Sequence, residues 1–309
     1  NSDGKIIKWN INNSDYTQEI VAENSFVQRA LSVTPDGKYL ICATDESNIL
    51  VFSLDNQVEQ PQKLTGHTSI ISNVVVAPNN EYFISSSNDK TIRKWNLKTF
   101  TGEIISENES KINTITISPD SKTIAVGLQD GNIRLLHLDN LSQPGQITRD
   151  ANIAVTSLKY NHNGNWLVSG DSKGNVSIWD VEKRSLIENL EGHRSRIYDI
   201  DFNVKDDLMA TSSLDGTVRL WDCTNLNNQP IELRDHESWV LSIAFSPDGE
   251  KLITSSNQEE RILVWPVKPE EMAGEIKPLI KRNLTDEEWD AFIAEDIDYE
   301  KTIPELNEY

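Results

Sequence analysis

One spacing recurs along this chain and limits the folds that it can adopt. Seven short apolar segments each lead to a large apolar anchor residue, and successive anchors are 41 to 44 positions apart. The anchors are Trp9, Phe52, Trp95, Leu136, Trp179, Trp221 and Trp265. A fixed period of this length indicates a repeat architecture, in which each unit buries its apolar face against its neighbour.

Tight turns keep the same phase as the anchors. One set is Thr34-Pro35-Asp36-Gly37, Ala77-Pro78-Asn79-Asn80, Ser118-Pro119-Asp120-Ser121, Asn161-His162-Asn163-Gly164 and Ser246-Pro247-Asp248-Gly249. Pro, Asp or Asn, and Gly each favour one dihedral of a tight turn. A second set lies six residues before the anchors, at Asp3-Gly4, Asp89-Lys90, Asp130-Gly131 and Asp215-Gly216. Apolar alternation on both sides of the turns predicts antiparallel strands.

Gly-His pairs open some of the repeats. Gly66-His67 and Gly192-His193 lie 28 residues before Trp95 and Trp221, and Asp235-His236 lies in the same phase. The order of Gly-His, turn Asp and Trp-Asp at a period near 42 strongly resembles the WD-repeat family. The resemblance covers roughly residues 2 to 280 and implies an all-β propeller of four-stranded blades.

In that family the Gly-His histidine, a Ser or Thr, the turn Asp and the Trp form a hydrogen-bonded chain within a blade. The resemblance implies such a structural network in two repeats. The first contains His67, a Ser among residues 85 to 87, Asp89 and Trp95; the second contains His193, Ser212 or Ser213, Asp215 and Trp221. A His near Asp and Ser also fits a catalytic triad, but repetition of the set and the buried indole favour the structural role.

The strand count predicts an incomplete blade. Counting the four strands of a blade from the axis outward, the chain has seven third strands but only six first and six second strands. We therefore expect a seven-bladed ring whose first blade, around Trp9, is incomplete, in the carboxy-terminal part of a longer protein. The alternative is a six-bladed ring closed by a strand near Tyr16.

The charge distribution separates a body, residues 1–281, from an acidic tail, residues 282–309. Net charge is −20, and the tail holds ten Asp and Glu against two Lys and Arg. Nucleic-acid and anionic membrane partners both require dense Lys and Arg, so neither is expected. The two cysteines are far apart and outside any metal-ligand spacing, so no metal or other cofactor is expected. No apolar run is long enough to span a bilayer, and the amino terminus shows no signal segment, which favours a cytoplasmic location.

A short helix is predicted in the tail at about residues 285–294. Thr285 and Glu288 form a capping box, and the apolar face contains Trp289, Phe292 and Ile293. This face is expected to dock on the propeller itself or on a partner. The segment 299–304 resembles the end of bacterial WD-repeat regions fused to STAND-type NTPase or caspase-like modules, although Ile303 stands where those regions usually have Cys.

The expected function is a non-catalytic protein-interaction scaffold or sensor that binds a protein, a peptide or upstream domains of the same chain. By resemblance, partner contacts come from residues beside the start of each innermost strand. These are Trp239, Arg196, Tyr198, Ile70, Lys111 and Leu241. Trp, Tyr and Arg dominate binding hot spots, although Trp239 could equally pack between blades. The alternative is a small-molecule enzyme that uses the central channel, but the Val- and Ser-rich inner strands offer no repeated acid or His.

Overall fold

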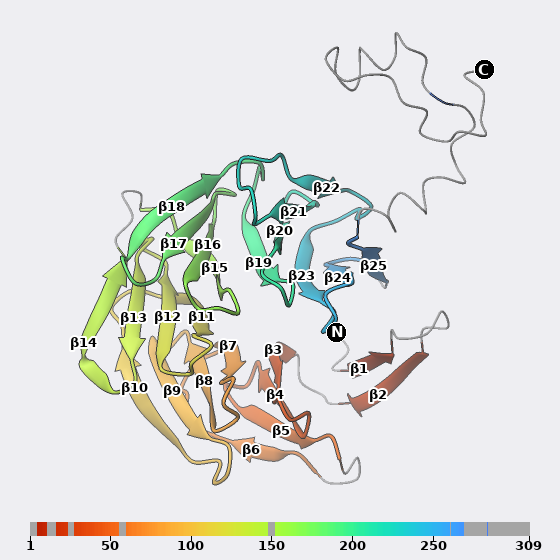
Figure 1. Ribbon diagram of the computed structural model, residues 1–309. Coiled ribbons are helices and arrows are strands. Elements are labelled where there is room, and N and C mark those ends of the chain that lie inside the picture. The colour runs from red at the N-terminus through yellow and green to blue at the C-terminus, as the bar shows by residue number, and fades with distance from the viewer. Residues whose placement is uncertain are drawn as a thin grey trace.

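The computed structural model describes residues 5–10, 17–23, 28–55, 60–147, 152–259, 261–268 and residue 283. All regular structure in these residues is β-strand, and the strands radiate as small sheets around a central axis (Figure 1). The expected all-β propeller is therefore confirmed. The predicted helix at 285–294 and its docking face, Trp289, Phe292 and Ile293, lie outside the described residues.

Six blades follow one another around the ring. Blade 1 contains β3 (Gln28–Val33), β4 (Tyr39–Thr44), β5 (Ile49–Ser53) and β6 (Gln62–Leu64); blade 2 contains β7 (Ile71–Val76), β8 (Tyr82–Ser87), β9 (Thr91–Asn96) and β10 (Gly102–Glu107); blade 3 contains β11 (Ile112–Ile117), β12 (Thr123–Leu128), β13 (Ile133–His137) and β14 (Asn140–Ile147). Blade 4 contains β15 (Val155–Tyr160), β16 (Trp166–Asp171), β17 (Val176–Asp180) and β18 (Ser185–Leu190); blade 5 contains β19 (Ile197–Phe202), β20 (Leu208–Ser213), β21 (Val218–Asp222) and β22 (Ile231–Leu233); blade 6 contains β23 (Val240–Phe245), β24 (Lys251–Ser256) and β25 (Ile262–Pro266). All neighbouring strands within a blade are antiparallel.

The predicted Pro-Asp-Gly turns join the first and second strands of the blades. The amide of Gly37 donates to the carbonyl of Thr34 over 2.8 Å, and Gly37 has a φ of 71°. Asp36 accepts from the Thr34 hydroxyl at 2.7 Å and from the Lys38 amide at 3.1 Å. Gly at this position avoids the strain that a side chain meets at positive φ.

The hydrophobic core lies between blades rather than inside any one of them. Between blades 4 and 5, for example, Val168 and Ile178 on one sheet pack with Phe202, Met209 and Trp221 on the next. Because each sheet is apolar on both faces, a blade is buried only when it has a neighbour on each side.

Side chains also connect successive innermost strands. The side-chain amide of Asn73 donates to the backbone carbonyl of Asn113 at 3.1 Å, and the side-chain amide of Asn113 donates to the backbone carbonyl of Val155 at 3.0 Å. The Thr156 hydroxyl continues the series to the carbonyl of Ile197 at 2.7 Å. These bonds occupy backbone groups at the free inner edges of the sheets, and we call them the inner staples.

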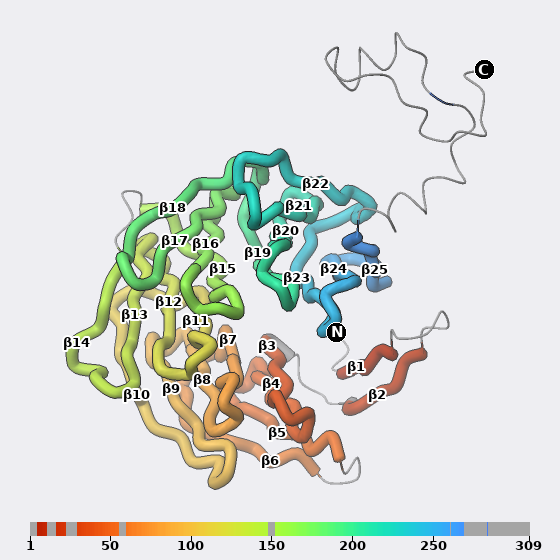
Figure 2. The backbone as a smooth tube through the Cα atoms, in the orientation of Figure 1, coloured from red at the N-terminus to blue at the C-terminus, as the bar shows by residue number. Residues whose placement is uncertain are grey.

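The number of blades differs from the expected seven. Six blades are present in the described residues, and the repeat around Trp9 forms only a two-stranded ribbon, β1 (Lys5–Asn10) with β2 (Thr17–Glu23). Figures 1 and 2 show the ribbon in the sector between blade 6 and blade 1. The six-bladed alternative needed a strand near Tyr16 to close the ring, but β2 pairs with β1.

Candidate functional site

One end of the ring presents a repeated set of residues just before the innermost strands. In five blades, the residue just before the innermost strand accepts a hydrogen bond through its backbone carbonyl. The donor is a backbone N–H in the turn between the second and third strands of the same blade. The five carbonyls belong to Ile70, Lys111, Ala154, Arg196 and Trp239, with distances of 2.9 to 3.0 Å. We call these five positions, with Tyr198 and Leu241 beside them, the rim. Their backbones are held alike while their side chains differ, and Ala154 is the member that sequence reasoning missed.

The rim side chains combine aromatic, aliphatic and cationic groups. Trp239 is 46% exposed, so its side chain is not enclosed between blades. Ile70 and Lys111 are exposed, and Leu241 is half-buried. The Arg196 guanidinium lies over the Tyr198 ring at 5.3 Å, a cation–π geometry that holds both side chains in place.

The predicted networks form inside the blades. In blade 2, His67 Nδ1 lies 2.9 Å from Asp89 Oδ2 and His67 Nε2 lies 2.8 Å from Ser85 Oγ. The Trp95 indole N–H donates to the same Ser85 oxygen at 2.8 Å. In blade 5, His193 lies 3.1 Å from Asp215 and 2.8 Å from the hydroxyl that accepts from Trp221.

The Asp–His–Ser order of blade 2 matches a catalytic triad in distance but not in access. The side chains of His67 and Ser85 are fully buried, so a substrate carbonyl cannot reach the Ser85 oxygen. That oxygen also accepts the Trp95 indole N–H, which engages the electron pair that a nucleophile would use. The arrangement therefore connects strands and does not attack substrates.

Burial and hydrogen bonding set the protonation of this network. Burial lowers the pKa of His67 against the opposing effect of Asp89, which favours the neutral ring. Burial alone would raise the pKa of Asp89, but hydrogen bonds from Thr68 and Thr91 contribute to lowering it to about 2. A neutral imidazole can donate to the Asp89 carboxylate and accept from the Ser85 hydroxyl, so both of its ring nitrogens are hydrogen-bonded.

The structure corrects one member of the predicted networks and adds a third network that the sequence did not predict. In blade 5 the hydroxyl belongs to Thr211, not to Ser212 or Ser213. Blade 6 holds a third complete network, in which His236 contacts Glu259 at 2.7 Å and shares Thr254 with Trp265. The carboxylate follows its histidine by 23 residues instead of 22, because this turn is one residue longer. That extra length, visible in the sequence, was the available signal.

The innermost strands also contain charged residues that sequence reasoning passed over. Asp199 and Asp201 lie on β19, where their carboxylates accept the backbone amides of Ile243 and Phe245 at 3.1 and 2.8 Å. Lys159 on β15 forms an ion pair with Asp201 at 2.8 Å. Burial raises the pKa of Asp199 to about 6, although the Ile243 amide and the Lys159 charge oppose this effect. These groups bind blades 4, 5 and 6 together at the channel.

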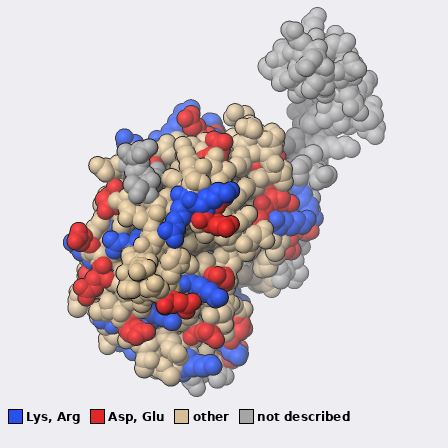
Figure 3. All heavy atoms as spheres, turned by 60° about the vertical axis from the view of Figure 1, so that its left-hand side comes forward, with Lys and Arg blue, Asp and Glu red and all other residues tan. Residues whose placement is uncertain are grey.

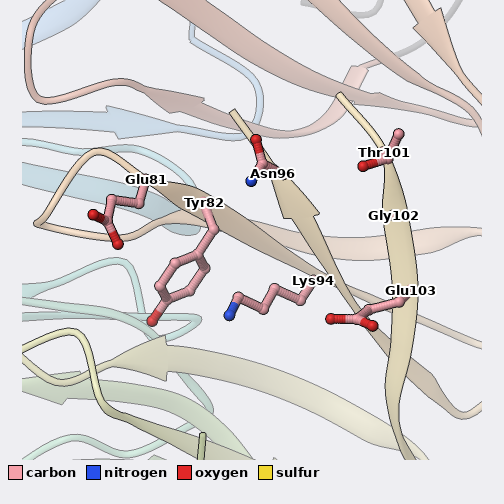
Figure 4. A pocket seen from close by; sticks show the side chains of 7 residues that line it. All are labelled: Glu81, Tyr82, Lys94, Asn96, Thr101, Gly102 and Glu103. Atoms are coloured by element: carbon pink, nitrogen blue, oxygen red, sulfur yellow. The ribbon is translucent and has the colours of Figure 1, made fainter. Parts of the chain in front are cut away.

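A shallow cavity of about 350 Å³ opens on blade 2 (Figure 4). Tyr82, Lys94 and Glu103 reach into it from three adjacent strands, and Lys94 Nζ lies 4.6 Å from the Tyr82 ring. Gly102 is required at its wall, since a Cβ there would lie 2.3 Å from the Trp95 ring. Gly102 therefore allows the Trp95 ring to pack closely against this wall.

The described residues offer no metal cluster, and the face in Figure 3 carries no dominant charged patch. The described residues include no cluster of three or more His, Cys, Asp or Glu able to hold a metal ion. On the face shown in Figure 3, acidic and basic side chains alternate without a large area of one sign. In the part of the chain that the structure describes, no helix has the length and apolarity to span a membrane.

Comparison with known families identifies the repeat. The family model described as "WD domain, G-beta repeat" matches residues 58–96, 97–136, 145–180, 184–222 and 227–265, which is more than half of the chain. The chain belongs to the WD-repeat family of β-propellers. Each matched segment ends at an anchor position or one residue after it, from Trp95 to Trp265, in agreement with the period.

Several known proteins are similar to this chain. The target of rapamycin complex subunit wat1 of Schizosaccharomyces pombe is 28% identical over 64% of this chain and 63% of its own length. The pre-mRNA-processing factor 19 homolog 2 of Arabidopsis thaliana is 27% identical over 61% of this chain and 36% of its own length. The guanine nucleotide-binding protein subunit beta of Zea mays is 23% identical over 85% of this chain and 75% of its own length. The chain therefore spans less than two thirds of wat1 and about a third of the pre-mRNA-processing factor 19 homolog. WD-repeat propellers of this kind are typically protein-interaction scaffolds.

Proposed function

We propose that this propeller is a non-catalytic scaffold that binds a protein or peptide through the rim. The observation that carries the proposal is the repeated backbone bond under the rim residues. A rigid frame that presents different side chains at equivalent positions provides recognition without loss of loop entropy on binding. Trp239, Tyr198 and Arg196 are of the residue types that concentrate binding energy at interfaces.

The rim favours a partner segment with an apolar side chain next to an acidic one. Trp239 and Ile70 offer exposed apolar surface, whereas Arg196 and Lys111 offer cationic groups. Arg196 and Trp239 precede the innermost strands of adjacent blades 5 and 6, so one short peptide can contact both. Arg196 remains available as a donor while its plane lies on Tyr198.

A site-specific crosslinker tests the rim. Placed at Trp239, a photoreactive residue should capture a native partner that the same residue at Ile231, an exposed position on the outer strand β22, does not capture. With the captured partner purified, Trp239→Ala should weaken affinity at least tenfold, and Ile231→Ala should leave it unchanged. Equal affinity for both variants would remove the rim from the binding surface.

We also propose that the propeller is the sensor part of a larger bacterial signalling or defence protein that acts in the cytoplasm. The support is the resemblance of residues 299–304 to the ends of WD-repeat regions fused to STAND-type NTPase or caspase-like modules. Intact mass and amino-terminal sequencing of the native protein test this assignment. An additional nucleotide-binding or protease module in the same polypeptide would support it, and its absence would contradict it.

We further propose that the β1–β2 ribbon occupies a seventh blade position. Its support is the packing of Ile6 on β1 in one apolar cluster with Leu40, Cys42 and Phe52 of blade 1. Ile49, the residue equivalent to Ile6 in blade 1, packs on blade 2 in the same way. Slow hydrogen exchange of residues 6–9 in the isolated chain is expected if the ribbon is held there, and rapid exchange would contradict it.

A further inference from the structure

The cavity on blade 2 contains a charged side chain at a position that other blades use for their core. Lys94 stands one residue before the anchor Trp95 and is half-buried, and its side chain lines the cavity (Figure 4). The equivalent residues of the other four-stranded blades are Val51, Leu135, Ile178 and Leu220, with exposures of 4%, 2%, 0% and 3%. Burying part of a cation costs free energy. The charge is therefore an exception that packing does not explain.

The Lys94 ammonium has an aromatic neighbour but no counter-ion. Its Nζ lies 4.6 Å from the centre of the Tyr82 ring, a cation–π distance. The Tyr82 hydroxyl donates to the backbone carbonyl of Ser121 in blade 3 at 2.7 Å, which fixes the ring. Glu81 and Glu103 line the same cavity, yet in the part of the chain that the structure describes no carboxylate lies within ion-pair distance of Nζ. The ammonium is therefore available to an anionic group of a ligand.

The cavity has the size of a small-molecule site. Its volume of about 350 Å³ falls at the lower end of the range for such sites. Tyr82 and Trp95, which border it from β8 and β9, are only 4% and 3% exposed. At Gly102 one wall is backbone, because the Trp95 ring occupies the space that a side chain would take. Packing inside the blade therefore forms the cavity without help from a ligand.

The polar groups of the cavity include two donors and a free acceptor. The donors are the Lys94 ammonium and the Asn96 side-chain amide. The Asn96 oxygen accepts the backbone amides of Lys98 and Thr99 at 2.8 and 3.0 Å, which leaves its nitrogen on the side of Lys94 (Figure 4). The acceptor is the Glu103 carboxylate, which has no hydrogen bond or ion pair with another described residue. Glu103 is the register partner of Lys94, so both side chains lie on one face of the sheet.

This arrangement of charges disfavours ligands of a single sign. A phosphate or a dicarboxylate bound by Lys94 would place surplus negative charge beside Glu103 and Glu81. A simple cation bound by Glu103 would be repelled by Lys94. A molecule with a carboxylate and an ammonium group one carbon apart satisfies both sides, because the two protein groups face it from adjacent strands.

We propose that the cavity binds a free α-amino acid, with its carboxylate on Lys94 and Asn96 and its ammonium group on Glu103. This site goes beyond the scaffold function, because the cavity and the rim lie at opposite ends of blade 2. The cavity adjoins the start of β8 and the end of β9, whereas the rim carbonyl of Ile70 is bonded to the turn between these strands. A bound amino acid leaves the rim free, so the two proposals stand or fall separately.

Ligand-observed NMR titration of the 309-residue chain with each common amino acid tests the site. At least one amino acid should bind at concentrations up to about 10 mM. Two derivatives of the tightest ligand then separate its charges, since the amide lacks the carboxylate and the N-acetyl form lacks the ammonium group. Each derivative should bind about tenfold more weakly than the parent. The proposal is overturned if every amino acid fails to bind, or if either derivative binds as tightly as the parent.

Substitutions assign the two charges to their residues. Lys94→Leu introduces the residue type of Leu135 and Leu220, so the blade should fold while affinity falls about tenfold. Lys173→Leu changes an exposed lysine of blade 4 and is the matched control, with affinity equal to that of the unmodified chain. Glu103→Gln, at an exposed position, should bind the amino acid and its N-acetyl form with equal affinity.

The variants also define the results that contradict the site. Undiminished binding by Lys94→Leu would place the amino acid elsewhere on the chain. A preference for the free ammonium group that persists in Glu103→Gln would remove the acceptor from the proposal. An equal loss of affinity in Lys94→Leu and Lys173→Leu would show that overall charge, rather than the cavity, attracts the ligand.

Discussion

Blades 2 and 3 are neighbours that fill the same place with different chemistry. Blade 2 places Trp95 against a buried hydroxyl and extends the contact through His67 to Asp89. Blade 3 places Leu136 opposite Ile124 and has Val126 where blade 2 has its hydroxyl. Trp95 and Ser85 in blade 2 are buried, as are Leu136 and Val126 in blade 3, so apolar packing is sufficient for a blade and the hydrogen-bonded network is an added constraint. The residues of each solution are compatible only as a set.

Combining residues of the two sets within one blade should give the largest loss of stability. Ser85→Val leaves both the Trp95 indole and His67 Nε2 without their partner inside blade 2. We expect a loss of about 2–4 kcal/mol in the free energy of unfolding, measured by urea titration. Ser85→Thr, the residue type that blades 5 and 6 use, is the matched control and should cost less than about 1 kcal/mol. Similar losses for Val and Thr would show that the hydroxyl does not matter.

Low pH should destabilise blade 2, because it protonates the Asp89 carboxylate. The folded pKa of Asp89 is about 2, below the ordinary value of 3.8, so its contribution is complete above pH 4 and is lost as the pH falls toward 2. Neutral His67 acts in the same direction, because the unfolded chain takes up its proton first. Asp89→Asn should therefore remove roughly 2 kcal/mol of pH-dependent stability. Unfolding curves at pH 7 and pH 3 should show about half of this loss, because the folded carboxylate stays mostly ionised until the pH nears 2. Parallel pH profiles for the two proteins would contradict the prediction.

A paired replacement should be tolerated better than either single change. Blade 1 combines Phe52 with Cys42, so Trp95→Phe with Ser85→Cys transfers a natural set into blade 2. The double variant should lose less stability than the two single losses combined, by about 1 kcal/mol or more. Additive losses in a double-mutant cycle would mean that the two positions vary independently.

The smallest expected effect lies at the channel and has the opposite pH dependence. The folded pKa of Asp199 is raised to about 6, so the folded state is progressively disfavoured as pH rises from 4 through 6. Asp199→Asn keeps an acceptor for the Ile243 amide and should give a small gain in melting temperature above pH 6. No change is expected below pH 4. A loss of stability at pH 8 would show that the charge itself is needed there.

The sequence predicted the repeat, the tight turns and the members of two networks, because these depend on local pattern. It did not predict the hydroxyl of blade 5, since the run Thr211-Ser212-Ser213 offers three candidates and only the pairing of Trp221 with Met209 selects Thr211. Glu259 was hidden by a one-residue lengthening of its turn. Asp199 and Asp201 contact amides more than 40 residues away in the next blade, so no local pattern identifies their role.

The inner staples have a consequence for what the channel can bind. An unpaired strand edge normally accepts another extended chain, which is a route to aggregation and to peptide capture. Here Asn73, Asn113 and Thr156 occupy carbonyls on three consecutive inner edges, and the β19 carboxylates occupy two amides of β23. A peptide that entered the channel would find these backbone groups already taken. Strand addition is thereby discouraged at the centre of the ring, and recognition there must use side chains.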